Sequence, residues 1–433
     1  MLRRLDLRGV SDPTHNLPRP AVDGEGPRAA VRTILDDVHT RGDAALIDLT
    51  ERFDGVRLEQ LRVPEAAFTA ALDAQTADLR AALEFARDRI AEHHRTQLQA
   101  PTVHRSDGVE VRSSRVPVDR AGCYVPGGRA AYPSTLLMTA VPAIVAGVHE
   151  VVVCVPPDRA TGEIAPVTLA AAAAAGVTEV YSVGGAQAVG ALAYGTDSIR
   201  PVDVICGPGN RYVALAKQEV AGSVGVAAAF AGPSEVVVVA DSSTPAEFAA
   251  VDVILQAEHG PDGLAWLITW DEAVTDAVAD AVARLTEAAP RRDEIAATLA
   301  EGGYAVVVDD PAAAIAVANA IAPEHLELLV EDAESLLPLV RNAGAVFVGP
   351  WSPASIGDYL AGPSHVLPTY GSARFASALT VDDFLKHHHV VRLDGDAFDR
   401  VADATATLAD AEGLAAHAES IRLRQRARMG GDQ

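Results

Sequence analysis

The feature that most constrains the fold is a series of short β-branched segments, most of them followed by an alanine-rich stretch of helical character. Continuous apolar strands that alternate with helices are typical of a parallel sheet covered on both faces. Eight such strands exceed one open sheet of ordinary size, so the sequence predicts an α/β protein with two doubly wound sheets. The predicted strands are Val151–Val155, Glu179–Val183, Val202–Cys206, Glu235–Ala240, Leu264–Trp270, Ala305–Val308, Leu326–Val330 and Ala345–Val348.

Both ends of the chain are predicted to be helical. Apolar residues recur at helical spacing over Arg28–Arg52, and Pro64–Gln99 is rich in Ala, Leu, Arg and Asp. Past Leu393 the pattern becomes helical again and ends in the basic stretch Ile421–Arg428. The length of 433 residues suits two domains with smaller additions.

The charge balance limits the possible partners. Acidic residues outnumber basic ones by 59 to 35, which gives a net charge of −24. Such a field repels phosphate backbones and anionic lipid surfaces, so we expect no nucleic-acid or membrane partner. Small molecules, cations and further copies of the chain remain.

The cysteine content and the apolar segments predict a soluble cytoplasmic protein. Only Cys123, Cys154 and Cys206 occur, without a CxxC motif, which favours a reducing compartment and small core residues. The first ten residues lack the apolar core of a signal peptide. The apolar stretch Leu136–Val148 is interrupted by Pro142 and is too short to span a bilayer.

Three glycine-rich turns follow predicted strands and precede predicted helices: Pro126–Gly128, Gly184–Gln187 and Gly207–Asn210. In a doubly wound sheet this is the carboxyl edge, where free amides at helix N-termini can bind a pyrophosphate. The usual GxGxxG fingerprint of dinucleotide binding is absent from the sequence. Nucleotide binding and purely structural turns therefore both remain open.

The stretch Thr244–Gly260 predicts a helix whose first residue is the N-cap, with Pro245 at N1 and Glu247 completing a capping box. Gln256 and His259 then lie three residues apart on one face. An imidazole beside an amide oxygen can hold zinc or manganese. Alternatively, His259 only caps the last carbonyl groups of the helix.

Two further stretches place ionisable side chains where chemistry is possible. Glu324 and His325 are adjacent after Pro323, and such a pair suits a reaction that moves more than one proton. Asp358 and His365 lie in a loop-like stretch rich in glycine and proline. A solvated helix cap and ordinary turn chemistry are the alternatives.

Near the C-terminus, Glu412 and His417 flank the sequence GLAA. If both lie on one helix, a spacing of five residues separates them by roughly 140°, so they converge only if Glu412 lies at a frayed helix start. The tract His387–His389 resembles a metal site, but strand alternation would point its members to opposite faces, so we interpret it as structural.

Taken in order along the chain, the motifs resemble the histidinol dehydrogenase family, and the resemblance covers essentially the whole sequence. The motifs are YVPGG (Tyr124–Gly128), GGAQAV (Gly184–Val189), GPGN (Gly207–Asn210), AGPSE (Ala231–Glu235), QAEHGPD (Gln256–Asp262), PEHLEL (Pro323–Leu328), GDYLAGPSHVLPTYG (Gly357–Gly371), VDDFLK (Val381–Lys386) and AEGLAAHAES (Ala411–Ser420).

The resemblance implies an NAD-dependent oxidoreductase that takes L-histidinol through L-histidinaldehyde to L-histidine, the last steps of histidine biosynthesis, with one Zn²⁺ per subunit. It implies a homodimer with shared active sites. The implied fold has two incomplete Rossmann-like doubly wound domains, one inserted in the other, and a helical C-terminal tail. The implied segments are 1–123 (N-terminal helices and the first part of domain 1), 124–233 (inserted domain 2), 234–380 (the rest of domain 1, with the zinc and catalytic residues) and 381–433 (a tail that reaches the partner's site).

The resemblance also assigns roles by matching positions. The acid/base pair matches Glu324 and His325. The zinc ligands match Gln256, His259, Asp358 and His417, the last from the other subunit. The substrate contacts match Ser234, Gln256, His259, His325, Asp358, His365, Glu412 and His417. The NAD contacts match Tyr124, Gln187 and Asn210.

Three other functions compete with this interpretation. A related zinc-dependent dehydrogenase could oxidise a small polyol or a sulfonated diol, although the presence of both Glu412 and His417 favours histidinol. A zinc hydrolase could use Glu324 as general base, and it would not turn over NAD⁺. A non-catalytic metal-binding paralogue is disfavoured by the intact Glu324–His325 pair.

Overall fold

The computed structural model describes residues 1–18, 25–128, 130–227, 234–258, 260 and 263–430. Its contacts divide the chain into two compact units. The larger unit comprises residues 1–97 and 118–384, and the smaller one comprises residues 98–117 and 385–433. None of the described helices is long and apolar enough to cross a lipid bilayer.

The larger unit contains a six-stranded sheet in which every neighbouring pair of strands is parallel. In spatial order its strands are β1 (Arg3–Asp6), β11 (Gly303–Val307), β10 (Leu264–Thr269), β9 (Glu235–Ala240), β12 (His325–Leu329) and β13 (Ala345–Val348). Alternate side chains of β9 enter two separate apolar clusters: Val236 and Val238 on one face, Val237 and Val239 on the other. Helices therefore cover both faces, as the continuous apolar strands predicted.

One face of this sheet packs against helices that precede and follow β10, and the other face packs against the helix before β12. The first group consists of α9 (Ala246–Ala257), α10 (Glu272–Ala288) and α11 (Arg292–Gly302). The opposite face carries α12 (Pro311–Ile321) and the short α13 (Ala333–Leu336). A further short helix, α14 (Ala354–Tyr359), follows β13.

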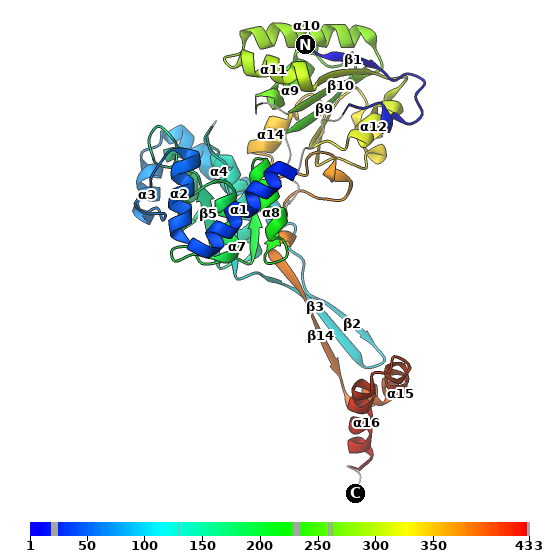
Figure 1. The fold of residues 1–433 in the computed structure, drawn as a ribbon. Helices are drawn as coiled ribbons and strands as arrows, with labels where there is room; N and C mark the ends of the chain where they lie inside the picture. The colour runs from blue at the N-terminus through cyan, green and yellow to red at the C-terminus, as the bar shows by residue number, and fades with distance from the viewer. Residues whose placement is uncertain (19–24, 129, 228–233, 259, 261–262, 431–433) are drawn as a thin grey trace. The chain divides into compact units, whose positions relative to one another are not determined.

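A second, five-stranded sheet of the larger unit is also parallel throughout. Its strands in spatial order are β6 (Glu179–Ser182), β5 (Glu150–Val155), β4 (Arg120–Tyr124), β7 (Val204–Cys206) and β8 (Gly225–Val226). The connecting helices are α5 (Pro133–Ala146), α6 (Pro166–Ala175), α7 (Gly185–Tyr194) and α8 (Arg211–Val220). The two sheets and their helices are drawn in Figure 1.

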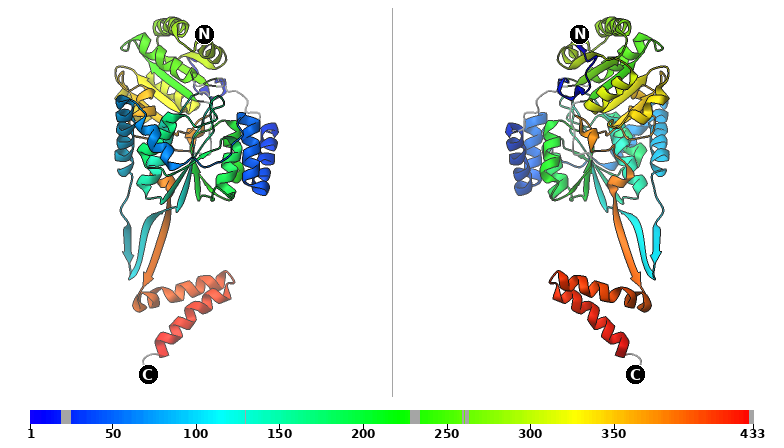
Figure 2. Two further views of the ribbon diagram at one scale, coloured as in Figure 1. Left: turned by 90° about the vertical axis from the view of Figure 1, so that its left-hand side faces the viewer. Right: turned by 90° about the vertical axis from the view of Figure 1, so that its right-hand side faces the viewer.

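The N-terminal helices pack against the helices of the five-stranded sheet. They are α1 (Glu25–Arg41), α2 (Asp43–Asp54), α3 (Glu65–Asp73) and α4 (Ala77–Arg95). In Figure 2, α1 and α2 (dark blue) lie against α7 and α8 (green), while α3 and α4 contact α6. Each of the two long helical stretches predicted here is a pair of helices, and the first pair is separated at Gly42, whose φ of 55° suits glycine.

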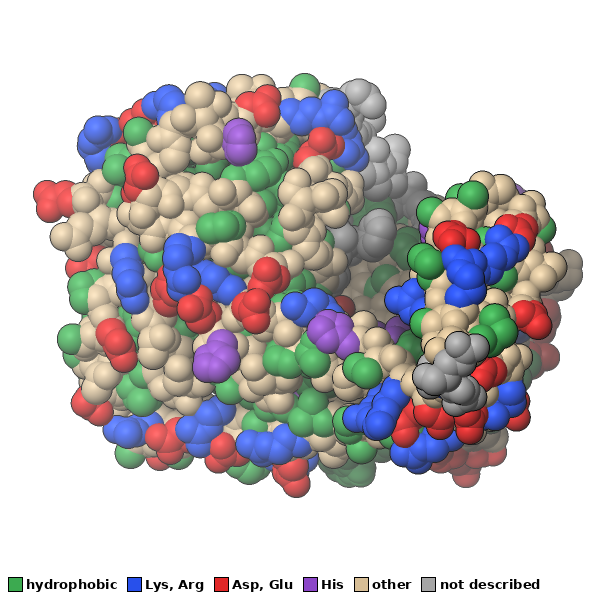
Figure 3. All heavy atoms as spheres, turned by 90° about the horizontal axis from the view of Figure 1, so that it is seen from below, with side chains coloured by type: hydrophobic (Ala, Val, Ile, Leu, Met, Phe, Trp, Pro, Cys, Tyr) green, Lys and Arg blue, Asp and Glu red, His purple; other side chains and the backbone are tan. Residues whose placement is uncertain are grey.

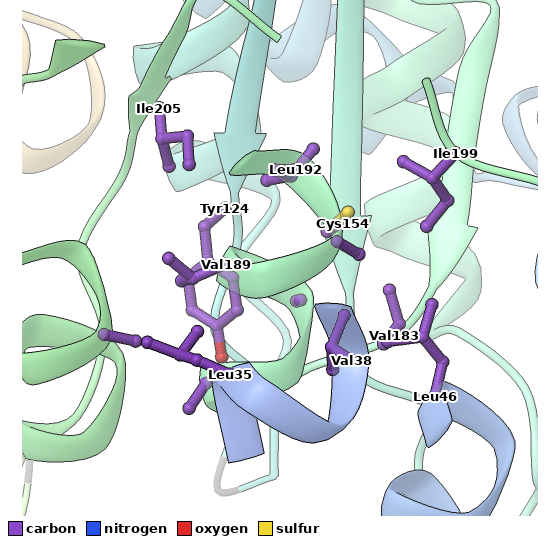
Figure 4. Packing of buried hydrophobic residues seen from close by; sticks show 14 of the residues in the cluster. Leu35, Val38, Leu46, Tyr124, Cys154, Val183, Val189, Leu192, Ile199 and Ile205 are labelled. Carbon is purple, nitrogen blue, oxygen red and sulfur yellow. The ribbon is translucent and has the colours of Figure 1, made fainter. Parts of the chain in front are cut away.

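The core of this region is a cluster of buried side chains around Tyr124, at the end of β4. Figure 4 shows its ring between Leu35 of α1 and Val189 of α7, with Val38 and Leu192 nearby. The cluster attaches the N-terminal helices to the five-stranded sheet because both contribute to one apolar core.

The smaller unit consists of an antiparallel sheet and two helices. The sheet has the order β14 (Leu385–Leu393), β3 (Val109–Pro117) and β2 (Thr102–Ser106). The helices α15 (Gly395–Ala411) and α16 (Ala415–Gly430) pack together, with Arg428 paired to Asp399 at 2.7 Å. Figure 3 shows side chains of both charges interspersed over the face drawn.

All eight predicted strands are confirmed, with ends that shift by at most two residues. The predicted capping box at the start of α9 is wrong. The structure has Pro245 as N-cap, with φ −55° and ψ 132° and no side-chain cap hydrogen bond. The three cysteines are free and buried, as predicted.

Candidate active site

Glu324 and His325 lie at the start of β12, next to the central strand β9. Helix α12 ends in a left-handed residue, Ala322 (φ 54°), and Pro323 then directs the chain into the strand. The pair therefore lies at the edge of the six-stranded sheet formed by the amino ends of its strands. Both side chains are buried, so neither is the solvated cap that the sequence left open.

The carboxyl group of Glu324 is fixed by the adjacent strand. Its Oε2 accepts a hydrogen bond of 3.0 Å from the backbone N–H of Glu235, the first residue of β9. Burial raises the pKa of Glu324 to about 7, although the nearby His325 and the Glu235 N–H act in the opposite direction. A carboxyl group whose pKa is near neutrality can both accept and donate a proton at that pH.

The imidazole of His325 has polar groups at both nitrogens. Its Nδ1 lies 3.3 Å from Nε2 of Gln256 and 3.3 Å from the carbonyl oxygen of Glu235. Its Nε2 lies 3.4 Å from Oδ1 of Asp358. Burial alone would lower the pKa of His325, but Glu324 and Asp358 raise it overall. Phe347 of β13 stacks on the ring, with centroids 5.9 Å apart.

Two of the predicted zinc ligands meet at this imidazole. Gln256 lies in the last turn of α9 and is buried, and its Oε1 has no hydrogen-bond partner among the described residues. Asp358 lies in α14 rather than in the predicted loop, because that stretch forms a short helix. The unpartnered amide oxygen of Gln256 and the carboxylate of Asp358 belong to side chains that both contact this imidazole, and zinc accepts oxygen ligands. His259, the third predicted ligand, lies outside the described residues.

His417 and Glu412, the remaining predicted site residues near the C-terminus, belong to the smaller unit. The two residues do not share one helix: Glu412 is the C-cap of α15, and His417 lies in the first turn of α16. Between them the chain turns at Gly413, whose φ of 74° favours glycine. Within the described part of the chain, no three His, Cys, Asp or Glu side chains are grouped to hold a metal ion.

His365 and Ser234 flank the pair on other segments. Nδ1 of His365 lies 2.9 Å from the carbonyl oxygen of Asp358, and its Nε2 lies 3.1 Å from Oγ1 of Thr135. Thr135 belongs to α5, so His365 connects the two α/β regions of the larger unit. Ser234 immediately precedes β9, and its carbonyl oxygen accepts a bond from the Leu264 N–H.

The three predicted NAD contacts lie where strands of the five-stranded sheet end. The hydroxyl of Tyr124 accepts a bond of 3.2 Å from the N–H of Gly185, and burial raises the pKa of Tyr124 to about 12. Gln187 is buried in the first turn of α7. Asn210 is the N-cap of α8 and accepts bonds from the two amides that follow Arg211.

A cavity of about 290 Å³ opens at the same edge. It is lined by the glycine-rich turn after β4 and by residues that follow β5, including Pro156 and Asp158. At Gly207 the chain passes so close to β4 that an added Cβ would lie 2.0 Å from the carbonyl oxygen of Tyr124. Two of the glycine-rich turns, Pro126–Gly128 and Gly207–Asn210, lie between a strand and a helix, as predicted. In the third, Gly184 is the N-cap of α7, and Gly185–Gln187 already belong to that helix.

Several residues of the site are not predicted from the sequence. Glu235 and Phe347 lie on strands that pair with β12, and they reach His325 only through sheet pairing. Asp252 and Glu327 are buried carboxyl groups directly behind the pair. Glu327 could have been found from the period of two along a strand, which puts it on the same face as His325.

The structure shows a buried carboxyl–imidazole pair beside the side chains of Gln256 and Asp358, in a protein with two parallel sheets, which is an arrangement typical of an α/β enzyme. A family model described as histidinol dehydrogenase matches residues 17–425. A histidinol dehydrogenase from Parasynechococcus marenigrum is 49% identical over 91% of this chain and 90% of that protein. One from a Synechococcus strain is 50% identical over 92% of each.

Structure comparison agrees with the sequence comparison. The crystal structure of histidinol dehydrogenase from Elizabethkingia anophelis matches with a TM-score of 0.93 and 34% identity, over 98% of both chains. The chain therefore belongs to the histidinol dehydrogenase family, and it is an oxidoreductase.

Proposed function

We propose that this protein oxidises L-histidinol through L-histidinaldehyde to L-histidine, with two molecules of NAD⁺ and one Zn²⁺ per subunit. The observation that carries the proposal is the convergence of Glu324, Gln256 and Asp358 on the imidazole of His325. An alcohol-to-acid oxidation removes two hydrides and several protons, and a buried carboxyl–imidazole pair provides two groups for that proton transfer.

The two members of the pair have different roles. His325 accepts the proton of the substrate hydroxyl as the first hydride leaves. Glu324 then removes a proton from the water that adds to the aldehyde, and the hydrate loses the second hydride. Both side chains are buried, which keeps the aldehyde away from bulk water between the two steps.

The residues present fit both absent groups. When bound, NAD⁺ supplies a hydride acceptor, and zinc supplies a cation that orients the nitrogens of the substrate. The proposed zinc ligands are Gln256, His259, Asp358 and, from the other subunit, His417. The unpartnered Oε1 of Gln256 supports the metal assignment. The cavity beside the glycine-rich turn 126–128 supports NAD binding near Tyr124, Gln187 and Asn210.

The proposal extends to the assembly. Glu412 and His417 belong to a unit that makes its own sheet and helix pair, which supports a homodimer whose tails complete each other's sites. Ser234 and His365 are proposed substrate contacts on the described chain. The segments 1–123, 124–233, 234–380 and 381–433 are the proposed domains, with Rossmann-like winding in the two sheets. A cytoplasmic location stays a prediction.

A substrate panel tests the proposal against its nearest alternative. Purified protein with zinc and NAD⁺ is given L-histidinol, a small polyol or a sulfonated diol, and NADH formation is followed by absorbance. We expect turnover with L-histidinol alone. Turnover with one of the other alcohols would keep the fold and the acid/base pair but overturn the substrate, and no NADH with any alcohol would favour the hydrolase.

A further inference from the structure

Two buried carboxyl groups behind the acid/base pair are not used in the reaction described above. Glu327 on β12 has no exposed surface, and Asp252 on α9 is 5% exposed. The two side chains are hydrogen-bonded to each other. Carboxylate oxygens only accept hydrogen bonds, so this contact requires a proton on one of them.

The Asp252–Glu327 contact is arranged like the Gln256–His325 contact, because each joins one residue of α9 to one residue of β12. Side chains two residues apart on a strand share a face, so Glu327 points to the same face as His325. Side chains four residues apart on a helix are neighbours, so Asp252 lies one turn before Gln256. The contact between Asp252 and Glu327 therefore runs beside the contact between Gln256 and His325.

Glu327 also contacts the other element that carries a proposed ligand. Its Oε1 accepts a bond of 3.0 Å from the N–H of Ala354, the first residue of α14. Four residues later on the same helix, Asp358 lies 3.4 Å from Nε2 of His325. The carboxyl group of Glu327 therefore contacts both α9 and α14, the two helices whose oxygen-bearing side chains lie beside His325.

The electrostatic surroundings favour a single shared proton. Burial raises the pKa of Glu327 to about 9, and the charge of Asp252 acts in the same direction. Burial also raises the pKa of Asp252. Oε1 of Glu327 accepts the Ala354 N–H, whereas Oε2 has no hydrogen-bond partner among the described residues. A proton held between the two carboxyl groups agrees with this arrangement.

We propose that Asp252 and Glu327, sharing one proton, are positioning residues that hold α9 and α14 against β12 so that Gln256 and Asp358 can bind the same ligand beside His325. The identity of that ligand as zinc rests on the proposed function. The carboxyl pair itself does not touch the reacting atoms.

The test compares two substitutions at Glu327 in the full-length protein. Glu327→Gln keeps an acceptor for the Ala354 N–H and supplies a donor to Asp252, so we expect its zinc affinity and kcat/KM to stay close to those of the wild type. Glu327→Leu keeps a similar volume, but its leucine can neither accept the Ala354 N–H bond nor donate to Asp252. We expect it to lose about tenfold or more in zinc affinity, the size of effect found when a group that orients metal ligands is removed. Competition with a chelator measures this without any turnover.

Val238→Ala is the matched control. Val238 of β9 is paired with Glu327 of β12 and is fully buried. It belongs to the apolar cluster on the face of the six-stranded sheet that packs against α9. Its truncation lowers the melting temperature by leaving a cavity, without changing a hydrogen bond. We expect unchanged zinc affinity. An equal loss of zinc affinity in Val238→Ala, or wild-type affinity in Glu327→Leu, would overturn the proposal.

Two further measurements keep the result interpretable. If Glu327→Leu does not fold, Asp252→Leu compared with Asp252→Asn tests the α9 contact and leaves the Ala354 bond in place.

Amide exchange in α14 needs neither zinc nor substrate. Faster exchange in α14 of Glu327→Leu than in α14 of Glu327→Gln and Val238→Ala supports the positioning role, even if the wild type binds no zinc. Absence of zinc binding by the wild type would overturn only the proposed function. Equal exchange in all three variants would overturn the positioning itself.

Discussion

Gly357 of α14 lies directly against the ring of Phe347: a Cβ added at Gly357 would be 2.5 Å from Cε1 and 2.6 Å from Cζ. The same ring stacks on His325, and the residue after Gly357 is Asp358. The absence of a side chain at Gly357 therefore sets how closely α14 approaches β13 and how closely Asp358 approaches the imidazole.

Replacing Gly357 with Ala should displace Asp358. The contact is too short to be relieved without moving α14 or the aromatic ring, and either shift changes the surroundings of His325. We expect zinc affinity to fall by about tenfold or more, by analogy with other changes that misorient metal ligands. Chelator competition measures the change, and Ser355→Ala in the same helix is the control. Equal affinities in the two variants would show that α14 adapts freely.

Substitution of the acid/base pair should separate the two oxidation steps. We expect His325→Asn to reduce the oxidation of L-histidinol by about 10²- to 10⁴-fold, the usual contribution of a general base, and to leave the oxidation of L-histidinaldehyde less affected. Glu324→Gln should have the opposite pattern. Steady-state rates with each substrate measure both effects. A wild-type rate of histidinol oxidation in His325→Asn would contradict the role of His325.

The buried Glu327 should make stability depend on pH in a defined direction. Its pKa rises from the usual 4.5 to about 9 on folding, so the folded protein keeps a proton that the unfolded chain releases. This contribution is fully present below the unfolded value and is lost as pH rises through about 9. Between about pH 6 and pH 9, the melting temperature of the wild type should therefore fall relative to that of Glu327→Gln. Melting temperatures of the two proteins that change in parallel with pH would refute this prediction.

Arg120 should matter for folding but not for chemistry. It is 5% exposed and binds Glu179 through two nitrogens, at 2.9 and 2.6 Å, and Glu150 at 2.7 Å. Because removing one member of a buried ion pair leaves an unpaired charge, Arg120→Leu should lower the free energy of unfolding by about 3 kcal/mol. Arg200→Leu, which removes an exposed partner of Glu150, should cost below about 1 kcal/mol. Urea titration measures the free energy of unfolding of both variants. Similar values for Arg120→Leu and Arg200→Leu would contradict the stabilising role of the buried Arg120.

The parallel strands could be predicted from the sequence because buried strands must be apolar along their whole length. Two strands that the sequence does not predict, β1 and β14, lack this pattern for physical reasons. β1 (Arg3–Asp6) is an edge strand with three of its four residues exposed. β14 (Leu385–Leu393) is exposed along nearly its whole length, so neither of its faces shows an apolar period. Its register with β3 is visible only in the structure.

The candidate site could be predicted only in part. The adjacency of Glu324 and His325 is visible in the sequence, but their burial depends on β9 and α9 packing around them. The general rule for parallel sheets predicts ligands at the carboxyl ends of strands, whereas this pair lies at the amino ends. The contacts of Glu327 with Asp252 and Ala354 arise from tertiary packing between three segments, which no local pattern encodes.

The stoichiometry of NADH formation tests the central claim most directly. Purified, zinc-loaded protein is given limiting L-histidinol and excess NAD⁺, and the total NADH is counted before and after treatment with a chelator. A four-electron oxidation predicts two NADH per histidinol, lost on chelation and restored by zinc. One NADH per histidinol with release of the aldehyde, or a yield that chelation leaves unchanged, would contradict the account.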